Sequence, residues 1–486
     1  MFMTKEMKLR RYWPYALLLI LVCVSYANSL GNGFVYDDFE FIVDNKSVYQ
    51  LENWPAYFSN AQTTSAFIPF AHYRPLVTLL FAFEYQLFAT NPLGYHALSV
   101  LLHLVNVLLV FRFLMALSLR RELALAGASL FAVHPLQTEA VCWISGQGNL
   151  LFTLFYLSAL LVFLEHLKKP RWYWLVSVCL CYLTGLFVKE MIITLPALLL
   201  LLDLHSNTNL QDKLRRRLTY LGLCGLIAVF YLLTRTSVLG MLAMRDYWGG
   251  SLGSTLLTQA VVTLRYLALF LLPLRQRLLY DLPVYHSLLG PPFLGLLILL
   301  GLGFLIFRLR KTIPLLSLGL AFFFVAILPV SNLIPISLLL AERFMYWPSL
   351  GLIICLLGIL DYYAAEKLPQ ALFPLLVLLI LLMSLATFSR NRVWRSELSL
   401  WTDNLRTSPQ HVEVNYNYAI ALHRLERFAE AAAAYRRTLE LKPDHAPAME
   451  NLAVMSPLGG VSEKEAFEWM RLAKQTRQRR NPRPQN

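Results

Sequence analysis

The chain has 486 residues, of which 57% are hydrophobic and 15% are charged, and its mean hydropathy is +0.53. A soluble domain of this length could not bury so much apolar surface, so the composition excludes a soluble globular protein. The net charge of +14 does not indicate nucleic-acid binding. Many basic residues sit in short clusters between apolar runs, where such clusters fix the orientation of membrane helices.

Long apolar runs recur along most of the chain and predict a polytopic, all-α membrane protein. A hydrocarbon core of about 30 Å requires about 20 mostly apolar residues as a helix, and lipid admits only helices or closed barrels. The runs are continuous and rich in leucine rather than alternating, which favours helices. About eleven spans are expected, near 13–30, 96–118, 122–134, 149–166, 172–188, 191–204, 217–235, 292–308, 312–330, 346–362 and 369–388.

The orientation follows from the flanking residues. No small-residue cleavage site follows the first run, so we expect a retained helix rather than a signal peptide. The basic N-terminus is predicted to be cytoplasmic, and the acidic loop 31–95 to lie outside the membrane. The segment 252–274 is ambiguous. We expect it to be interfacial or re-entrant, which leaves an odd number of spans and an external C-terminus, whereas a crossing would place the C-terminus inside.

The composition changes near Trp394, where a helical repeat domain is expected to begin. Residues 411–445 match a tetratricopeptide repeat of 34 residues. With Val412 at position one, the small, aromatic and proline positions of the repeat fall on Ala419, Ala431, Tyr435 and Pro443. The predicted domains are therefore a membrane domain over 1–390, a repeat domain over 394–476 and a disordered tail over 477–486.

Charges beside membrane helices are the informative residues, since one at the bilayer centre costs about 2.5–3.5 kcal/mol. Asp37 and Asp38 follow the first apolar run. One of the two could be a general base, or both could belong to a solvated acidic loop. Arg74 stands at the entry to a helix, where its guanidinium suits a phosphate because it donates two parallel hydrogen bonds. The alternative is an interfacial arginine.

Two adjacent pairs of charged residues are predicted on the same outer side as Asp37. They are Lys189-Glu190 and Glu342-Arg343, and either could be a salt bridge within a turn. Acids, cations and aromatic residues at outer helix ends suit a site for a lipid-anchored phosphate. The sequence contains no Walker loop, Rossmann glycine pattern or zinc-site spacing, so neither a nucleotide cofactor nor a metal site is predicted.

Six motifs, in this order and followed by the repeats, carry a family resemblance: "NGFVYDDFEFI", "YRPLVTLLF", "NPLGYHALSVLLHLVNVLLV", "LFAVHPLQTEAVCWISGQGNLL", "FVKEMIITLPALLLLLDL" and "LAERFMYWPSLG". The chain resembles the transmembrane and tetratricopeptide-repeat-containing protein O-mannosyltransferases over residues 30–355 and the repeats. The resemblance implies a C-type glycosyltransferase fold. It also implies transfer of a sugar from a polyprenyl or dolichyl phosphate on the outer face of the membrane.

The resemblance also implies roles for single residues. The acidic motif Asp37-Asp38 holds the catalytic base, with Asp37 favoured, and the sugar is transferred in one inverting displacement. The residues implied for the donor phosphate are Arg74, Lys189 and Arg343, and those implied for the pocket are His134, Glu139, Glu190 and Glu342. No cofactor is implied beyond the lipid-linked sugar, and a requirement for a divalent metal is left open.

The acceptor implied by the family is a Ser or Thr hydroxyl of an exported protein, held by the repeats, and a glycan or lipid acceptor is the alternative. The compact loops favour a bacterial inner membrane with periplasmic repeats, or the endoplasmic reticulum membrane in a eukaryote. A non-catalytic repeat scaffold would not need Asp37-Asp38 beside a lipid groove. A flippase or transporter would carry its charges deep within the spans rather than at their outer ends.

Overall fold

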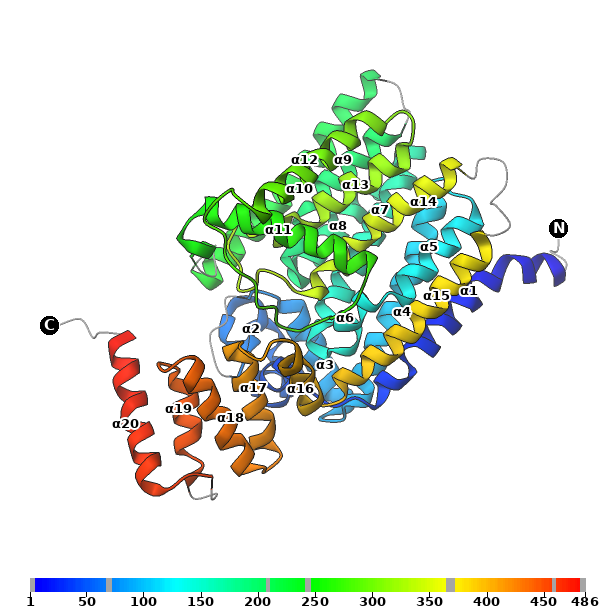
Figure 1. The fold of residues 1–486 in the computed structure, drawn as a ribbon. Helices are drawn as coiled ribbons and strands as arrows, with labels where there is room; N and C mark the ends of the chain where they lie inside the picture. The colour runs from blue at the N-terminus through cyan, green and yellow to red at the C-terminus, as the bar shows by residue number, and fades with distance from the viewer. Residues whose placement is uncertain are drawn as a thin grey trace. The chain divides into compact units, whose positions relative to one another are not determined.

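The computed structural model describes residues 5–66, 72–206, 210–240, 246–363, 372–456 and 460–480. Within these ranges all regular secondary structure is helical, which confirms the all-α class (Figure 1). The chain divides into two compact units. The membrane unit comprises residues 1–32, 37–276 and 282–392, and the repeat unit comprises residues 33–36, 277–281 and 393–486.

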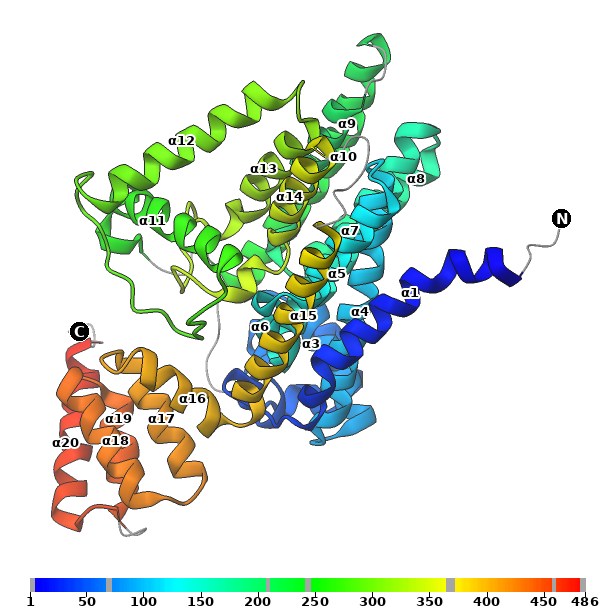
Figure 2. The same ribbon diagram turned by 45° about the vertical axis from the view of Figure 1, so that its right-hand side comes forward.

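The membrane unit contains fifteen α-helices within the described residues: α1 (Lys5–Tyr26), α2 (Trp54–Ser59), α3 (Pro75–Phe88), α4 (Pro92–Ala116), α5 (Arg121–Val133), α6 (Thr138–Cys142), α7 (Gln147–Lys168), α8 (Trp172–Val188), α9 (Leu195–His205), α10 (Leu210–Leu239), α11 (Leu252–Leu271), α12 (Pro291–Leu309), α13 (Pro314–Ile327), α14 (Ser349–Tyr363) and α15 (Leu372–Asn391). Proline occupies the first turn of α3, α4, α9, α12 and α13. It suits that position because its fixed φ is helical and its missing N–H would have no partner there. Consecutive helices pack as hairpins, with α7 against α8 and α13 against α14 (Figures 1 and 2).

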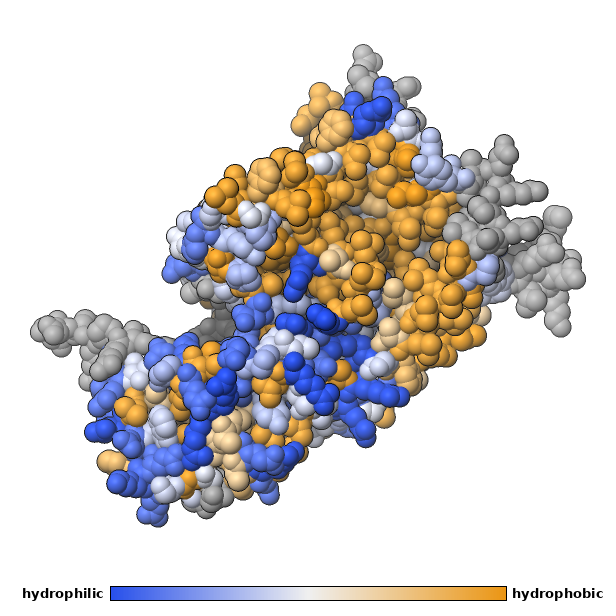
Figure 3. Space-filling model, in the orientation of Figure 1, coloured by the Kyte–Doolittle hydropathy of each residue, from blue (hydrophilic) through white to orange (hydrophobic). Residues whose placement is uncertain are grey.

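Seven helices of the described residues are long and apolar enough to cross a membrane: Tyr12–Gly31, Pro92–Ala116, Ile144–Lys168, Leu214–Leu239, Leu252–Leu271, Pro291–Leu309 and Pro374–Arg395. Four shorter apolar helices accompany them: Pro75–Phe88, Trp172–Val188, Pro314–Val330 and Ser349–Tyr363. Apolar side chains dominate the visible surface over α12 to α15 (Figure 3). The protein is therefore a multi-pass membrane protein, as its composition predicted.

Several elements differ from the expectation. The predicted spans near 122–134 and 191–204 form α5 and α9, which have 13 and 11 residues and are not among the long or the shorter apolar helices of the described residues. The helix α3 lies in the segment 31–95, which was predicted as an external loop with a helix entry at Arg74, and α3 begins directly after that residue. It has only 14 residues, too few to be recognised as a span by length. The segment 252–274 was predicted to be interfacial or re-entrant. It forms α11, and the length and composition of this helix are sufficient for a crossing.

The repeat unit contains five α-helices within the described residues, each packed against the next: α16 (Glu397–Thr407), α17 (Val412–Arg424), α18 (Phe428–Leu441), α19 (Ala446–Ala453) and α20 (Glu463–Arg480). Its core contains Ala419, Ala431 and Tyr435, the positions at which the repeat pattern requires small or aromatic residues. The helix α20 continues into the segment predicted as a tail, and residues 481–486 lie outside the described residues.

Two short segments from elsewhere in the sequence belong to the repeat unit. In the first, the backbone N–H of Tyr36 donates to Glu397 Oε1 over 3.3 Å, and the Tyr36 ring meets Trp401 edge to face with centroids 5.2 Å apart. In the second, the backbone N–H of Leu278 donates to Asn404 Oδ1 over 3.0 Å. The chain therefore passes between the two units several times rather than once.

Candidate active site

A cavity of about 130 Å³ in the membrane unit gathers charged residues from distant parts of the sequence. We call it the charged cavity. Five residues nominated from the sequence line it: Asp37, Arg74, Lys189, Glu190 and Arg343. They come from the segment after α1, the entry to α3, the α8–α9 turn and the 3-10 turn Glu342–Met345. The carboxylate and the three cations named from the sequence thus share one cavity.

Asp37 is placed at a sharp change of chain direction. The preceding residue, Tyr36, has a φ of +54°, and a π-helical turn over Phe39–Val43 follows. Burial raises the pKa of Asp37 to about 7, with Arg343 acting in the opposite direction. A carboxylate whose pKa lies near neutrality can accept a proton at physiological pH and retains the driving force for proton transfer.

Asp38 is oriented differently from its neighbour. Its side chain is fully buried. Its Oδ1 accepts hydrogen bonds from the backbone N–H of Ser145 over 2.7 Å and from the Ser145 hydroxyl over 2.5 Å. Asp38 is not among the residues that line the charged cavity, whereas both Asp37 and Ser145 are. The geometry therefore distinguishes the two acids: Asp37 lines the cavity, and Asp38 anchors the acidic segment to the turn before α7.

Arg74 and Glu190 form a two-point ion pair at the wall of the cavity. Arg74 Nη2 lies 2.7 Å from Glu190 Oε1, and Arg74 Nε lies 3.3 Å from Glu190 Oε2. Burial opposes the ionisation of Glu190, but Arg74 outweighs burial and holds the pKa of Glu190 well below its usual range. The sequence suggested a turn salt bridge between Lys189 and Glu190. In the structure the carboxylate pairs with Arg74, more than a hundred residues away.

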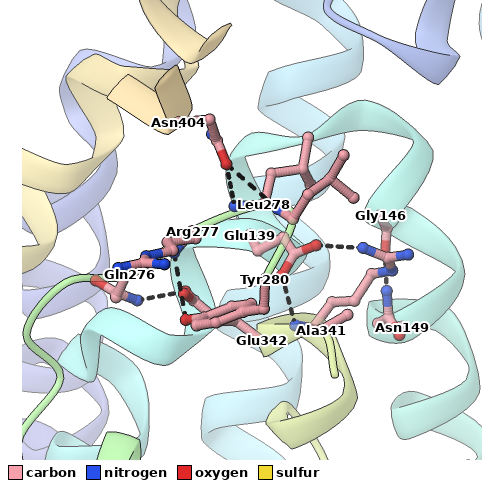
Figure 4. A network of polar contacts seen from close by, with 12 residues as sticks. Glu139, Gly146, Asn149, Gln276, Arg277, Leu278, Tyr280, Ala341, Glu342 and Asn404 are labelled. Atoms are coloured by element: carbon pink, nitrogen blue, oxygen red, sulfur yellow. Dashed lines mark hydrogen bonds and ion pairs between the residues drawn. The ribbon is translucent and has the colours of Figure 1, made fainter. Parts of the chain in front are cut away.

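Lys189 is held by neutral groups. Its Nζ donates to Asn149 Oδ1 and lies 5.7 Å and 5.6 Å from the ring centroids of Phe152 and Phe344. Asn149 in turn donates to the Gly146 carbonyl over 2.9 Å (Figure 4). Burial lowers the pKa of Lys189 well below its usual value. None of the ion pairs found within the described residues includes Lys189, so an anion in the cavity would favour its charged form.

Glu139 holds Arg343 in place through contacts to its side chain and its backbone. The guanidinium forms an ion pair with Glu139, and the backbone N–H of Arg343 donates to Glu139 Oε2 over 2.8 Å. The guanidinium carbon also lies 4.9 Å from the ring centroid of Trp143. Glu139 is almost fully buried and does not line the cavity, so it positions Arg343. The turn salt bridge suggested between Glu342 and Arg343 is replaced by this pair.

Glu342 and His134 were expected around the pocket, but neither is among the residues that line the charged cavity. Glu342 accepts a hydrogen bond from Gln276 Nε2 over 2.7 Å (Figure 4). His134 Nδ1 accepts from the backbone N–H of Leu136 over 3.2 Å, and its ring stacks on Phe270 with centroids 5.0 Å apart. Both side chains connect elements of the fold beside the site.

His72 and Asn149 also line the charged cavity, and neither was nominated from the sequence. Burial, with Arg74 adding to it, lowers the pKa of His72 to about 3, so its ring is neutral. His72 directly precedes the motif "YRPLVTLLF", and Asn149 lies within the motif "LFAVHPLQTEAVCWISGQGNLL". For His72, the signal available in the sequence was its closeness to Arg74, which had already been nominated.

Within the part of the chain that the structure describes, no group of three or more His, Cys, Asp or Glu side chains could hold a metal ion.

Residues 72–234 match the family model described as dolichyl-phosphate-mannose-protein mannosyltransferase. The chain is 30% identical to the human protein O-mannosyl-transferase TMTC1, over 91% of this chain and 56% of that protein. It is 27% identical to a protein O-mannosyl-transferase of Caenorhabditis elegans, over 88% of this chain and 63% of that protein. It is 26% identical to mouse TMTC3, over 90% of this chain and 52% of that protein. The chain thus spans little more than half the length of these relatives.

Among solved structures, the chain is similar to the crystal structure of the Archaeoglobus fulgidus oligosaccharyltransferase tethered with an acceptor peptide. The TM-score is 0.39 and the identity 14%, and the match covers 87% of this chain and 59% of that chain.

Fold and site together define a class: a multi-pass helical membrane protein with a charged cavity built from loops at helix ends. The sequence matches indicate a particular family. They support the family of the transmembrane and tetratricopeptide-repeat-containing protein O-mannosyltransferases, since the chain is similar to three such relatives over about nine tenths of its length.

Proposed function

We propose that this protein is an integral-membrane glycosyltransferase that transfers mannose or another hexose from a polyprenyl-phosphate-linked donor to an acceptor hydroxyl. One observation carries the proposal: Asp37 lines the same cavity as Arg74, Lys189 and Arg343. Such a transfer requires a base for the hydroxyl and positive charge for the departing phosphate, held together at one point.

In the proposed reaction Asp37 accepts the proton of the acceptor hydroxyl while the hydroxyl oxygen attacks the anomeric carbon. The bond between that carbon and the phosphate oxygen breaks, and the polyprenyl phosphate leaves from the opposite face, so the configuration inverts. The pKa of Asp37, raised to about 7 by burial, suits a base at neutral pH. The phosphate passes from a diester to a monoester and gains negative charge.

The three cations stabilise the charge that develops on the leaving phosphate. Glu190 holds Arg74 at two points, and Glu139 holds Arg343. These contacts set the plane of each guanidinium before the donor binds, and the remaining N–H groups can reach phosphate oxygens. Preorganised charge of this kind is the largest stabilising contribution that we expect from the site.

The acceptor that we propose is a Ser or Thr hydroxyl of an exported polypeptide, as the names of the relatives suggest. The repeat unit would hold such a polypeptide. The basic clusters of the sequence support a cytoplasmic N-terminus, with Asp37 on the opposite side of the membrane. The lipid of the donor would be undecaprenyl phosphate in a bacterium and dolichyl phosphate in a eukaryote.

The test uses purified full-length protein in lipid nanodiscs, with radiolabelled polyprenyl-phosphate-mannose and peptides from exported proteins. The Asp37→Asn variant should lose transfer by about a thousandfold, the order expected for removal of a general base, while its thermal unfolding stays cooperative. Asp44→Asn, an exposed acid of the same loop, is the matched control and should transfer normally. Full transfer by Asp37→Asn would overturn the mechanism.

A further inference from the structure

A second cavity, of about 260 Å³, adjoins the charged cavity. We call it the side cavity. The two cavities share Glu190, Pro329 and Ile336 as lining residues. The remaining walls of the side cavity come from α10, from the 3-10 turn Glu190–Thr194 before α9 and from the segment after α13, and they are mostly apolar. A molecule that fills both cavities would therefore have a charged end and an apolar end.

The side cavity is bordered by apolar side chains on the outer surface of the membrane unit. Ile334 is 59% exposed and Leu333 is 44% exposed, and both line the cavity. The neighbouring stretch of α10, Leu214–Leu239, is one of the helices long and apolar enough to cross a membrane. Leu232 of this helix lines the side cavity and is 39% exposed. Because exposed apolar surface of this kind suits contact with lipid, we infer that the side cavity opens toward the hydrocarbon.

Two polar side chains of α10 interrupt the apolar lining. Tyr231 and Arg235 both line the side cavity, and they lie one helical turn apart, on the same face of the helix. Tyr231 is 1% exposed, and its hydroxyl has no hydrogen-bond partner within the described structure. Its ring is held edge to face against Phe187, with centroids 5.9 Å apart.

A buried hydroxyl without a partner is destabilising, because it has lost its hydrogen bonds to water. Its retention beside a cavity is explained if a ligand supplies the missing acceptor. Glu190 lines the same side cavity but is already paired with Arg74. A phosphate oxygen at the junction of the two cavities would provide the acceptor for Tyr231.

We propose that the side cavity receives the first isoprene units of the donor's polyprenyl chain and that Tyr231 donates a hydrogen bond to the donor phosphate. This inference rests on the proposed function and adds to it a positioning residue and a route of entry for the lipid. The polyprenyl chain of the donor enters between α10 and the segment 328–336. The phosphate then reaches Arg74, Lys189 and Arg343, with Arg235 adding positive charge to the wall along which it passes.

Tyr231→Phe tests the hydrogen bond. Because the phosphate gains charge as it leaves, the hydrogen bond is stronger in the transition state, so kcat should fall more than KM rises. We expect kcat/KM to fall about tenfold to a hundredfold, the range for a hydrogen bond to a charged group. Thermal unfolding without donor should be unchanged or shifted upward. Tyr220→Phe, which removes the hydroxyl of another buried tyrosine of α10 that lines neither cavity, should keep wild-type kinetics.

Ile334→Trp tests the route of entry, since the larger side chain narrows the mouth. KM should rise at least fivefold for a donor with eleven isoprene units and stay unchanged for mannosyl phosphate on a two-isoprene lipid. A diazirine-bearing polyprenyl phosphate should also label the peptide that contains residues 328–336. If a diazirine phosphatidylcholine labels this peptide instead and the polyprenyl probe does not, the cavity holds bulk lipid and the inference is wrong.

The outcomes separate this inference from the proposed function. If the wild-type protein transfers mannose while Tyr231→Phe matches Tyr220→Phe and Ile334→Trp has no chain-length effect, this inference is overturned and the proposed function stands. If the wild-type protein neither transfers mannose nor binds polyprenyl phosphate, both are overturned.

Discussion

Two sets of polar residues include side chains of α10, and the two sets differ in their surroundings. Near the start of the helix, Arg216 and Arg217 both pair with Asp203 of α9, and Arg217 Nε lies 2.6 Å from Asp203 Oδ2. Further along, Tyr231 and Arg235 line the side cavity. At a rise of about 1.5 Å per residue, the two sets are about 20–30 Å apart along the helix. None of the three residues of the first set lines either the charged or the side cavity.

The difference shows that buried charge is not by itself a sign of a functional site. Asp203 is fully buried, and each of its oxygens is paired with an arginine, so this carboxylate compensates both guanidinium charges. By contrast, Arg74 is paired with Glu190 and Arg343 is paired with Glu139, and both arginines also line the open volume of the charged cavity. A closed cluster of this kind stabilises the fold, whereas an open cluster can bind an anion.

The largest effect on stability is expected at the closed cluster. Asp203→Asn removes the carboxylate that compensates two arginines, and loss of one partner of a buried ion pair costs about 3–5 kcal/mol of unfolding free energy. Thermal unfolding in detergent should show the loss, while the turnover per folded molecule stays at the wild-type value. An unchanged unfolding temperature, or a loss of turnover by the folded protein, would remove the contrast between the two clusters.

The open cluster should show the reverse behaviour. Arg74→Gln should lower kcat/KM by about a hundredfold to a thousandfold, as expected for loss of one group that stabilises the leaving charge. The side chains of Arg74 and Glu190 are 25% and 39% exposed, so their pairing should contribute at most about 1 kcal/mol to stability. The matched control is Arg120→Gln, which breaks the comparably exposed pair between Arg120 and Asp361. Arg120 lines neither cavity. Equal kinetics for the two variants would contradict the assignment of Arg74.

The pH dependence of the rate should report on Asp37. Burial raises the pKa of this carboxyl to about 7, and the protonated form cannot accept a proton. Below pH 7, kcat/KM should therefore fall about tenfold for each unit, to about one hundredth of its maximum at pH 5, and above pH 7 it should level off. Initial rates between pH 5 and 8.5, at constant ionic strength, measure the profile. A flat profile between pH 5 and 7 would show that Asp37 is not the base.

The smallest effect is expected for an exposed pair in the repeat unit. Arg436 contacts Glu465 of α20 at 2.8 Å, and their side chains are 43% and 31% exposed. Arg436→Gln should lower the unfolding free energy of the full-length protein by about 0.2–1 kcal/mol. The difference should shrink as salt rises from 0.05 to 0.5 M, because salt screens exposed charges. A loss comparable to that of Asp203→Asn would mean that exposure is a poor guide to the energy of these pairs.

Much of the site could be predicted because charge next to a membrane helix is costly and therefore conspicuous. This reasoning selected Arg74, Lys189 and Arg343 as cations, and all three line the charged cavity. It did not select the correct partners. Neighbours in sequence were the available candidates for ion pairs, yet adjacent side chains in a turn point in different directions. Glu190 pairs with Arg74 and Glu139 pairs with Arg343 instead.

His72 shows a second limit of the sequence. A histidine in a loop follows no helical or strand period, so its neutral ring in the cavity has no signature beyond its closeness to Arg74. A helix entry was expected at Arg74, but the extent of α3 within the predicted loop was missed for a related reason. Its 14 residues are fewer than a span requires, and a short apolar helix inside a polar loop is hard to separate from the loop by length alone.

The sequence by itself determined the solvent and the class of this protein. Continuous apolar runs can satisfy their backbone in lipid only as helices, and this requirement holds whatever the helices pack against. The tertiary structure alone decided which of two adjacent acids faces the cavity. Asp37 lines it and Asp38 bonds to Ser145, because the direction of each side chain in this short helical turn depends on contacts with residues a hundred positions away. It also decided that the charged cavity continues into an apolar one, since a cavity exists only between elements that the chain brings together.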